Sequence, residues 1–300
     1  MDSNKTTRRT TSRGIQSVEI SCRLLQPFLS SPGPFSLKNL AQAAGMTPAK
    51  AHFYTVSLMR VGLLSRDSAG AVFSLGPTAL HLGLAALAQV DVVQAAQEPM
   101  QELRNQLGAP VFLSVWADNG PTIVQHFHGL RSSSWAMQVG AVLPPLSATG
   151  RALLAYHPPA LQHSIVEREL ATARPEDPWF DMSLDQVIRL LADIRQTGIS
   201  PRSGIVVPGF ASVAAAIIDH EGRAAAAITA IGDARYFDDR PDGKYAVALL
   251  EITRRISHSI GGPVIYSPNP PDIDVPSDLP GSPLETPSVD QKTPTRKRNR

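Results

Sequence analysis

The 300-residue sequence predicts an α+β protein with a small N-terminal domain and a larger C-terminal domain. Its length suggests two domains, because one domain usually takes about 100–200 residues. The first 76 residues show helix patterns followed by a hairpin pattern, and the later sequence shows hairpins with segregated helices, which is typical of an antiparallel sheet. A hydrophobic share of 43% and a charged share of 18% allow packed cores and exclude wholesale disorder.

The two ends of the chain lack the periodicity of folded elements. Residues 1–13 are polar and rich in Thr and Arg, so we expect a disordered basic arm. Residues 263–300 contain nine prolines, and Tyr266 is their only aromatic residue. We therefore expect a disordered, proline-rich tail. The basic cluster at 296–298 is interpreted as part of this solvated tail, with a second DNA-contacting arm as the alternative.

Three helices are predicted in the first folded region. Ser17 is expected to cap the first helix and Ser36 the second, while Thr47 and Pro48 form a cap and first turn for the third. The apolar spacing predicts which side chains face inward. In the first helix they are Val18, Cys22, Leu25 and Leu29, and in the second they are Leu37, Leu40, Ala41 and Ala44. The third helix runs to about residue 61, and its inward side chains are Ala51, Tyr54, Thr55 and Leu58.

Glycines separate these elements and end the third helix. Gly45 lies where a left-handed helix C-cap belongs, and Gly62 ends the third helix. Two short apolar runs, 63–66 and 71–75, flank the turn Asp67-Ser68-Ala69-Gly70 and predict a hairpin. Helix, helix, tight turn, helix and hairpin is the layout of a winged helix-turn-helix, here over residues 14–76.

A linker helix at 77–90 is expected to join the two domains. Pro77 opens it, and it carries Leu80, Leu84 and Leu87. Asp91 should cap the next helix, in which Val93, Ala96, Met100, Leu103 and Leu107 form a short heptad seam. We interpret these Leu-rich helices as a pairing surface between protomers of a homodimer, with packing on their own domain as the alternative.

The larger domain is predicted over residues 91–262. Strands are expected at 111–116, 122–128 and 135–139, and a second hairpin at 210–218 and 223–231. Ser147 should cap a helix through residue 155, and Ser183 a helix at 184–196 that Gly198 ends. Further helices are expected at 161–170 and between Tyr245 and Ile260.

Composition and charge restrict the function classes. The lone cysteine, Cys22, excludes an internal disulfide and a multi-cysteine metal site and fits a reducing cytoplasm. No apolar run has membrane-spanning length, and the polar, basic N-terminus does not resemble a signal peptide. Residues 1–80 carry nine bases and three acids, a net charge of +6, while the remainder carries −4. A basic front suggests contact with nucleic acid, although a basic arm without a partner is equally compatible.

No catalytic constellation is recognisable. The sequence has no G-x-S-x-G elbow, P-loop or G-x-G-x-x-G fingerprint. His126 and His128 share a strand face but lack a nearby third metal ligand, and we interpret them as ordinary sheet residues. Asp238 and Asp239 follow two aromatics in a loop and are interpreted as a solvated turn. We expect neither enzymatic activity, nor a cofactor, nor a metal.

Four segments carry a family resemblance. They are LKNLAQAAGMTPAKAHFYTVSLMRVGLLSR, FSLGPTALHLG, LPPLSATGRALLA, and TGI followed by FASVAAAIIDHEGRAAAAITAIG. In this order and spacing, residues 15–262 resemble the IclR family of bacterial transcriptional regulators. The resemblance implies a winged helix that binds double-stranded operator DNA, a GAF-like domain that binds a small-molecule effector, commonly a carboxylate or aromatic metabolite, and dimers or dimers of dimers that repress or activate transcription.

Two departures from the family pattern stand out. Close relatives usually carry an arginine in the recognition helix where this chain has Phe53. The segment ISPRSGIVVPGFASVAAAI also lacks the acidic residue that is common there. The resemblance therefore leaves the usual DNA contact and the class of effector to be established for this chain.

The helical wheel of the third helix defines a candidate DNA-reading face. Opposite Ala51 and Leu58 it presents Ala49, Phe53, Val56 and Arg60, flanked by Lys50, His52 and Ser57. We expect Lys50 and Arg60 to contact phosphates or guanine and Phe53 to meet a thymine methyl. In the alternative, Phe53 packs internally and another element reads the bases. Arg66 in the hairpin and the arm residues Arg8, Arg9 and Arg13 should add phosphate contacts.

The start of the helix after the prolines is the candidate effector site. Its residues are Ser147, Ala148, Thr149 and Gly150. Free N–H groups at a helix start can bind an anion, whereas ordinary capping by Ser147 is the alternative. The resemblance favours the effector site, because this segment matches the one that lines the pocket in relatives. Trp135, Phe210 and Ser212 are weaker candidates for an apolar wall and an added polar contact.

The function predicted from the sequence is a transcriptional regulator whose operator affinity depends on an effector. Two rival interpretations remain at this point. One is a small-molecule enzyme built on the C-terminal domain, and the other is a protein-interaction module that uses the winged helix.

Overall fold

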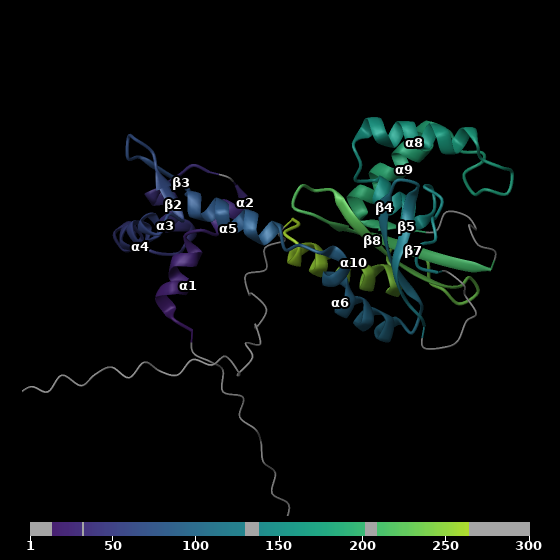
Figure 1. Cartoon of the computed structure of the whole chain (residues 1–300), viewed down its shortest axis with the longest axis horizontal. Coiled ribbons are helices and arrows are strands. Elements are labelled where there is room, and N and C mark those ends of the chain that lie inside the picture. Colours follow the sequence, from purple (N-terminus) through teal and green to yellow (C-terminus); the bar gives the residue numbers. More distant parts are fainter. Residues whose placement is uncertain (1–13, 32, 130–137, 202–208, 264–300) are drawn as a thin grey trace, which may run out of the picture. The chain divides into compact units, whose positions relative to one another are not determined.

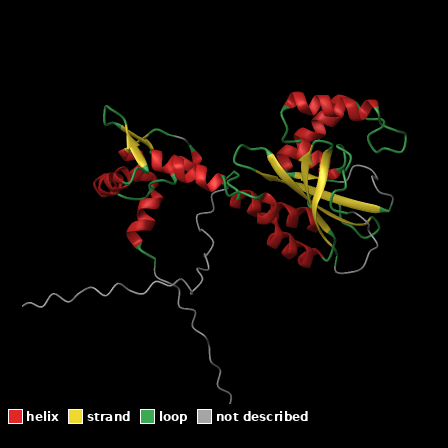
Figure 2. Cartoon of the chain, viewed as in Figure 1, coloured by secondary structure: helices red, strands yellow, loops and turns green. Residues whose placement is uncertain are grey.

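The computed structural model describes residues 14–31, 33–129, 138–201 and 209–263 (Figure 1). Helices and strands are both present, as the α+β prediction requires (Figure 2). The predicted N-terminal arm, the proline-rich tail and most of the strand expected at 135–139 lie outside the described residues.

The N-terminal region is a small helical domain with a three-stranded sheet. Its elements are α1 (Gln16–Arg23), α2 (Pro27–Ser30), β1 (Phe35–Ser36), α3 (Leu37–Ala43), α4 (Pro48–Arg60), β2 (Leu64–Arg66) and β3 (Val72–Leu75). The sheet is antiparallel in the order β1-β3-β2, so the predicted hairpin gains a third, two-residue strand. This is the winged helix-turn-helix that the sequence predicts.

Side-chain caps place α3 and α4 where the sequence predicts them. The Ser36 hydroxyl accepts a hydrogen bond from the Asn39 backbone N–H at 3.2 Å, and the Thr47 hydroxyl accepts one from that of Lys50 at 3.3 Å. Gly45 adopts a left-handed φ of 64° in the turn between the two helices, a conformation that costs glycine little. These local contacts fix the α3–turn–α4 unit.

The inward face predicted for the first helix is wrong. Ser17 lies inside α1 rather than at its cap, and Val18 and Leu29 are 57% and 69% exposed. The buried residues are instead Ile20, Leu24 and Phe28, which lie four residues apart. The predicted stripe and the stripe of Ile20, Leu24 and Phe28 overlap along this segment, and packing of the N-terminal core buries the latter.

Two helices follow the winged domain. Helix α5 (Pro77–Leu87) has no buried residue, whereas α6 (Val92–Leu107) buries Ala96, Met100 and Leu103. The Asp91 side chain caps α6 by accepting hydrogen bonds from the Val93 and Gln94 backbone N–H groups. The predicted protomer seam on α6 is therefore wrong, because its central residues belong to the core of the C-terminal domain.

The C-terminal domain is built on a five-stranded antiparallel sheet. Its strands are β4 (Val111–Ala117), β5 (Gly120–Phe127), β6 (Ile199–Ser200), β7 (Phe210–Ile218) and β8 (Ala224–Asp233), in the order β5-β4-β8-β7-β6. Its remaining helices are α7 (Ala148–Leu154), α8 (Pro159–Ala171), α9 (Leu184–Thr197) and α10 (Lys244–Ser259). Both predicted hairpins are confirmed, and the short edge strand β6 was not predicted.

Helices cover both faces of this sheet. Helices α6 and α10 pack on one face, where Val213, Ile228 and Leu249 lie in the largest core (Figure 1). Helix α7 packs on the other face, where Ala152 meets Ala214 and Ala227. From residue 226 of β8 onward, side chains at even positions of β7 and odd positions of β8 therefore face α7. The register shift at Ile217/Ile218 reverses the pattern before that point, so Ala224 packs on the α7 side.

No single helix among the described residues is long and apolar enough to cross a membrane. Helices α5 and α6 satisfy the length and hydropathy criteria only as a pair that is bent by 65° at the break between them.

Candidate nucleic-acid interface and ligand sites

Helix α4 presents a polar and aromatic face to solvent. Ala51, Thr55 and Leu58 are buried on its inner side. The residues predicted for DNA contact lie exposed on the other side, and they are Lys50, His52, Phe53, Ser57 and Arg60. Phe53 is 74% exposed, so the alternative in which it packs internally is excluded. The exposed phenyl ring is the feature that an apolar contact with a base would need.

The basic residues of this face have no acidic partner in the described part of the chain. Within the described segments, Lys50 and Arg60 form no ion pair. Lys50 lies in the first turn of α4 and Arg60 in its last, so the two charges lie at opposite ends of the helix. Uncompensated cations on an exposed helix surface are suited to phosphate binding.

The hairpin β2–β3 holds Arg66 over an aromatic ring. The Arg66 guanidinium lies 5.3 Å from the centroid of the Phe73 ring, and the side chain is exposed. The turn beside it is closed by Asp67, whose carboxylate accepts hydrogen bonds from the Val72 and Ala71 backbone N–H groups. These hydrogen bonds lower the pKa of Asp67, with the Arg66 charge acting in the same direction. The turn is thus held in one conformation with Arg66 at its base.

The start of α7 is closely packed. The Ser147 hydroxyl accepts a hydrogen bond from the Gly150 backbone N–H at 3.1 Å, which is the capping contact. A side chain at Gly150 would place its Cβ 2.2 Å from the Pro145 carbonyl oxygen, so glycine is required here. Ser147, Ala148 and Thr149 are all buried. Ser147 is thus the N-cap of α7, as predicted.

Thr149 connects this helix start to the sheet. Its hydroxyl lies 2.7 Å from the hydroxyl of Thr229 in β8, and both side chains are buried. Sequence reasoning missed Thr229, although a single hydroxyl in the alanine-rich run 224–230 is a signal that could have found it. The two threonines form a buried polar contact between α7 and the sheet.

Arg151 is a second feature that the sequence analysis missed. Its side chain is 2% exposed, and it donates hydrogen bonds to the carbonyl oxygens of Leu146, at 2.7 Å, and Pro201. Its Nε has no partner among the described residues, and neither does the buried hydroxyl of Ser200. Desolvation lowers the pKa of Arg151 to about 10, so the guanidinium still carries its charge at neutral pH.

The weaker effector candidates have different positions. Phe210 and Ser212 are half-buried on β7, at even positions that face the same side of the sheet as α7. Phe210 packs against the small core of Phe112, Ile123, Leu143 and Ile231. Trp135 lies outside the described residues. The structure therefore places five of the predicted effector residues on one side of the sheet, at α7 and β7, together with Ser147 before α7.

The histidine pair lies on strand β5 and just after it. The His126 and His128 ring centroids are 4.4 Å apart, and burial together with the His128 charge lowers the pKa of His126. In the part of the chain that the structure describes, no three His, Cys, Asp or Glu side chains are grouped so that they could hold a metal ion.

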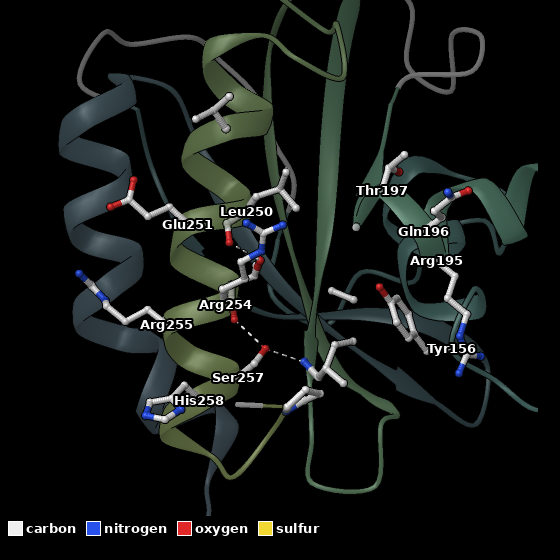
Figure 3. A pocket seen from close by; sticks show the side chains of 16 residues that line it. Tyr156, Arg195, Gln196, Thr197, Leu250, Glu251, Arg254, Arg255, Ser257 and His258 are labelled. Atoms are coloured by element: carbon white, nitrogen blue, oxygen red, sulfur yellow. Dashed lines mark hydrogen bonds between the residues drawn. The ribbon is translucent and has the colours of Figure 1, made fainter. Parts of the chain in front are cut away.

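A groove of about 800 Å³ lies between α10, the end of α9 and strand β7 (Figure 3). Tyr156, Arg195 and Arg254 contribute its aromatic and basic lining, and Ala216 and Leu250 contribute apolar surface. None of the predicted effector residues lines it. This groove is thus a separate concave site of the C-terminal domain.

A winged helix followed by an α+β domain with helices on both faces of its sheet defines a DNA-binding transcriptional regulator with a C-terminal sensor domain. The sequence matches the models for the IclR helix-turn-helix domain over residues 17–68 and for the bacterial transcriptional regulator IclR C-terminal domain over residues 84–258. The chain belongs to the IclR family of bacterial transcriptional regulators.

Curated relatives and solved structures agree with this assignment. The chain is 27% identical over 256 residues to the HTH-type transcriptional regulator BhcR of Paracoccus denitrificans, covering 82% of this chain and 88% of the relative. It is 27% identical over 259 residues to the glycerol operon regulatory protein of Streptomyces coelicolor, covering 83% and 98%.

Among solved structures, Pseudomonas aeruginosa HmgR is 35% identical with a TM-score of 0.72, covering 83% of this chain and 99% of HmgR. The Agobacterium tumefaciens repressor BlcR is 20% identical with a TM-score of 0.67, covering 84% of this chain and 99% of BlcR, and shares the fold.

Proposed function

We propose that this IclR-family regulator binds operator DNA through α4 and the β2–β3 hairpin, and that a small-molecule effector bound by its C-terminal domain changes that affinity. Such a protein would act in the cytoplasm. The proposed boundaries are 14–76 for the DNA-binding domain, 77–90 for the linker helix and 91–262 for the effector domain, flanked by the terminal segments 1–13 and 263–300. The observation that carries the proposal is the exposed face of α4 around Phe53.

The proposed DNA contacts divide into two kinds. Lys50, Arg60 and Arg66 contact phosphates or guanine, because they are exposed and have no acidic partner among the described residues. Phe53 contacts a thymine methyl, with His52 and Ser57 beside it on the same exposed surface. The first kind supplies affinity and the second supplies sequence preference.

A homodimer, alone or paired as a dimer of dimers, presents two such helices. The exposed leucines Leu80, Leu84 and Leu87 of α5 are the proposed protomer contact, since apolar side chains on an otherwise unburied helix gain by being covered. Two half-sites must lie about one helical turn, ~34–36 Å, apart, so a small change in dimer geometry alters operator affinity. The effector thereby acts through the coupling of two binding equilibria.

The proposed effector is a small carboxylate or aromatic compound, bound on the α7 side of the sheet by Ser147, Ala148, Thr149, Gly150, Phe210 and Ser212. Trp135, which lies outside the described residues, is a further proposed contact. The test is calorimetric titration with a panel of aliphatic and aromatic carboxylates, repeated on Ser147→Ala and Thr149→Val. Weakened binding in both variants supports the site. A carboxylate that keeps its affinity in both variants places the effector site elsewhere.

Operator binding is tested by genome-wide footprinting of the full chain, followed by fluorescence anisotropy on the recovered sequence. Binding that falls steeply with salt is expected, because phosphate contacts release counterions. A chain that leaves no footprint and binds no duplex would contradict the proposal and favour a winged helix that contacts protein.

A further inference from the structure

The groove between α10 and the end of α9 has two walls of different origin (Figure 3). Arg254 comes from α10, while Tyr156 follows α7 and Arg195 lies in the last turn of α9. Ala216 and Ile218 of β7, with Leu250 of α10, supply apolar surface between them. The groove therefore combines apolar surface with basic residues from two helices, and the Arg195 guanidinium lies over the Tyr156 ring.

The two arginines have no acidic partner among the residues that the structure describes. Within the described ranges neither Arg195 nor Arg254 forms an ion pair, and the Arg195 guanidinium lies 5.5 Å from the centroid of the Tyr156 ring. Burial raises the pKa of Tyr156, and the charges of Arg195 and Arg254 act against that rise. Both guanidiniums are thus within electrostatic reach of the tyrosine hydroxyl, which stays protonated and able to donate at neutral pH.

The other charged residues of the lining point away from the groove. Figure 3 shows Glu251 and Arg255 directed toward the neighbouring helix α6, where Arg255 pairs with Glu102. The acidic side chain of the lining therefore does not face Arg254 and Tyr156 across the groove. The lining therefore carries positive charge together with neutral polar side chains, among them Tyr156 and Gln196.

We propose that this groove is a second ligand site, separate from the α7 effector site, and that it takes a small organic anion with a flat apolar body, such as an aromatic carboxylate. Its volume of about 800 Å³ lies within the usual range for small-molecule sites. Arg254 binds the carboxylate and the Tyr156 hydroxyl donates to it, while Arg195, which lies over the Tyr156 ring, adds positive charge at longer range. Leu250, Ala216 and Ile218 contact the apolar body. The anion bridges α9 and α10, two helices that pack on different parts of the domain.

The test is titration of the full chain with 2-naphthoate, followed calorimetrically, with 2-naphthalenemethanol as the uncharged match. Because both arginines are exposed, we expect each of Arg195→Gln and Arg254→Gln to weaken naphthoate binding about threefold and the double variant about tenfold. The alcohol should bind more weakly than naphthoate and should be insensitive to both substitutions. Raised salt should weaken naphthoate binding in the unaltered chain.

Two control variants separate this site from others. Arg174→Gln removes an exposed arginine that pairs with Glu176 outside the groove and should leave naphthoate binding unchanged. Because an aromatic carboxylate is also a candidate ligand of the α7 site, the titrations are repeated in the Thr149→Val background. Naphthoate binding should persist there and should still depend on Arg195 and Arg254, so the failure of one site can be told from the failure of the other. Absence of saturable naphthoate binding at millimolar concentration, equal binding to the double variant, or loss of binding in Thr149→Val alone would overturn the proposal.

Discussion

At the scale of single residues, the buried threonine pair shows how the effector domain holds α7 on its sheet. The hydroxyls of Thr149 and Thr229 share one hydrogen bond at 2.7 Å, and both side chains are buried. Removing one hydroxyl strands the other without a partner, whereas removing both leaves an apolar contact of similar shape. We therefore expect Thr149→Val and Thr229→Val each to lower the free energy of unfolding by about 1–3 kcal/mol.

The double variant Thr149→Val/Thr229→Val provides the matched control for this prediction. It should lose less stability than the two single losses add up to, because it leaves no stranded hydroxyl. Urea unfolding of the four proteins measures the coupling. Strictly additive losses would show that the two hydroxyls do not depend on each other.

The pair of Asp238 and Arg240 gives a pH-dependent prediction. The hydrogen bonds from the Arg240 guanidinium lower the pKa of Asp238 to about 2. A carboxylate whose pKa is lowered by folding stabilises the protein above its unfolded pKa, and that contribution is lost as the pH falls through about 2. Arg240→Gln should raise the Asp238 pKa toward 3.8, as followed by NMR titration of the side-chain carboxyl. An unchanged pKa would show that Arg240 does not hold this carboxylate in solution.

At the scale of elements, hydroxyl caps determine where α4 begins. Thr47 caps α4 through the Lys50 N–H, and Pro48 occupies the first turn. Thr47→Ala should lower the free energy of unfolding by about 1 kcal/mol, the usual loss for a helix cap. Thr47→Ser keeps the hydroxyl and serves as the control in thermal unfolding. Equal losses in the two variants would assign the effect to the methyl group rather than to the cap.

Caps and turns were predictable from the sequence because they depend on residues within one turn of each other. Ser36, Thr47, Asp91, Ser147 and Ser183 all cap the helices they were expected to cap. The inward face of α1 was not predictable in this way, because two apolar stripes overlap and tertiary packing selects one. The apolar face of α6 was predicted correctly, but the surface against which it packs was not. The seam on α6 illustrates this, since Met100 and Leu103 pack in the core of the domain itself.

In the candidate sites too, features that depend on local spacing were predictable and contacts between distant segments were not. The exposed face of α4 follows from helical periodicity alone, so Lys50, Phe53 and Arg60 were identified before the structure. Thr229 lies 80 residues from Thr149, and Arg151 contacts the Pro201 carbonyl 50 residues away. No local pattern relates such distant positions, and neither partner was found from the sequence.

At the scale of the whole molecule, the exposed leucines of α5 concern assembly. Leu80 and Leu84 are 62% and 55% exposed, and covering each in a dimer is worth roughly 1.5–3 kcal/mol. Leu84→Asp should therefore yield monomers and greatly weaken operator binding, because two half-sites are no longer bound together. Light scattering at micromolar concentration measures the mass. A dimeric Leu84→Asp protein would place the protomer contact elsewhere.

The central claim is that α4 reads operator DNA through its exposed face. The most direct measurement is the salt dependence of operator affinity for the unaltered chain, Lys50→Ala and Arg60→Ala, with Lys38→Ala on α3 as the control. If Lys50 and Arg60 contact phosphates, each variant should bind all sequences more weakly, and the slope of log affinity against log salt should fall by about one. Unchanged affinity and slope in both α4 variants would contradict the account and assign DNA binding to another surface.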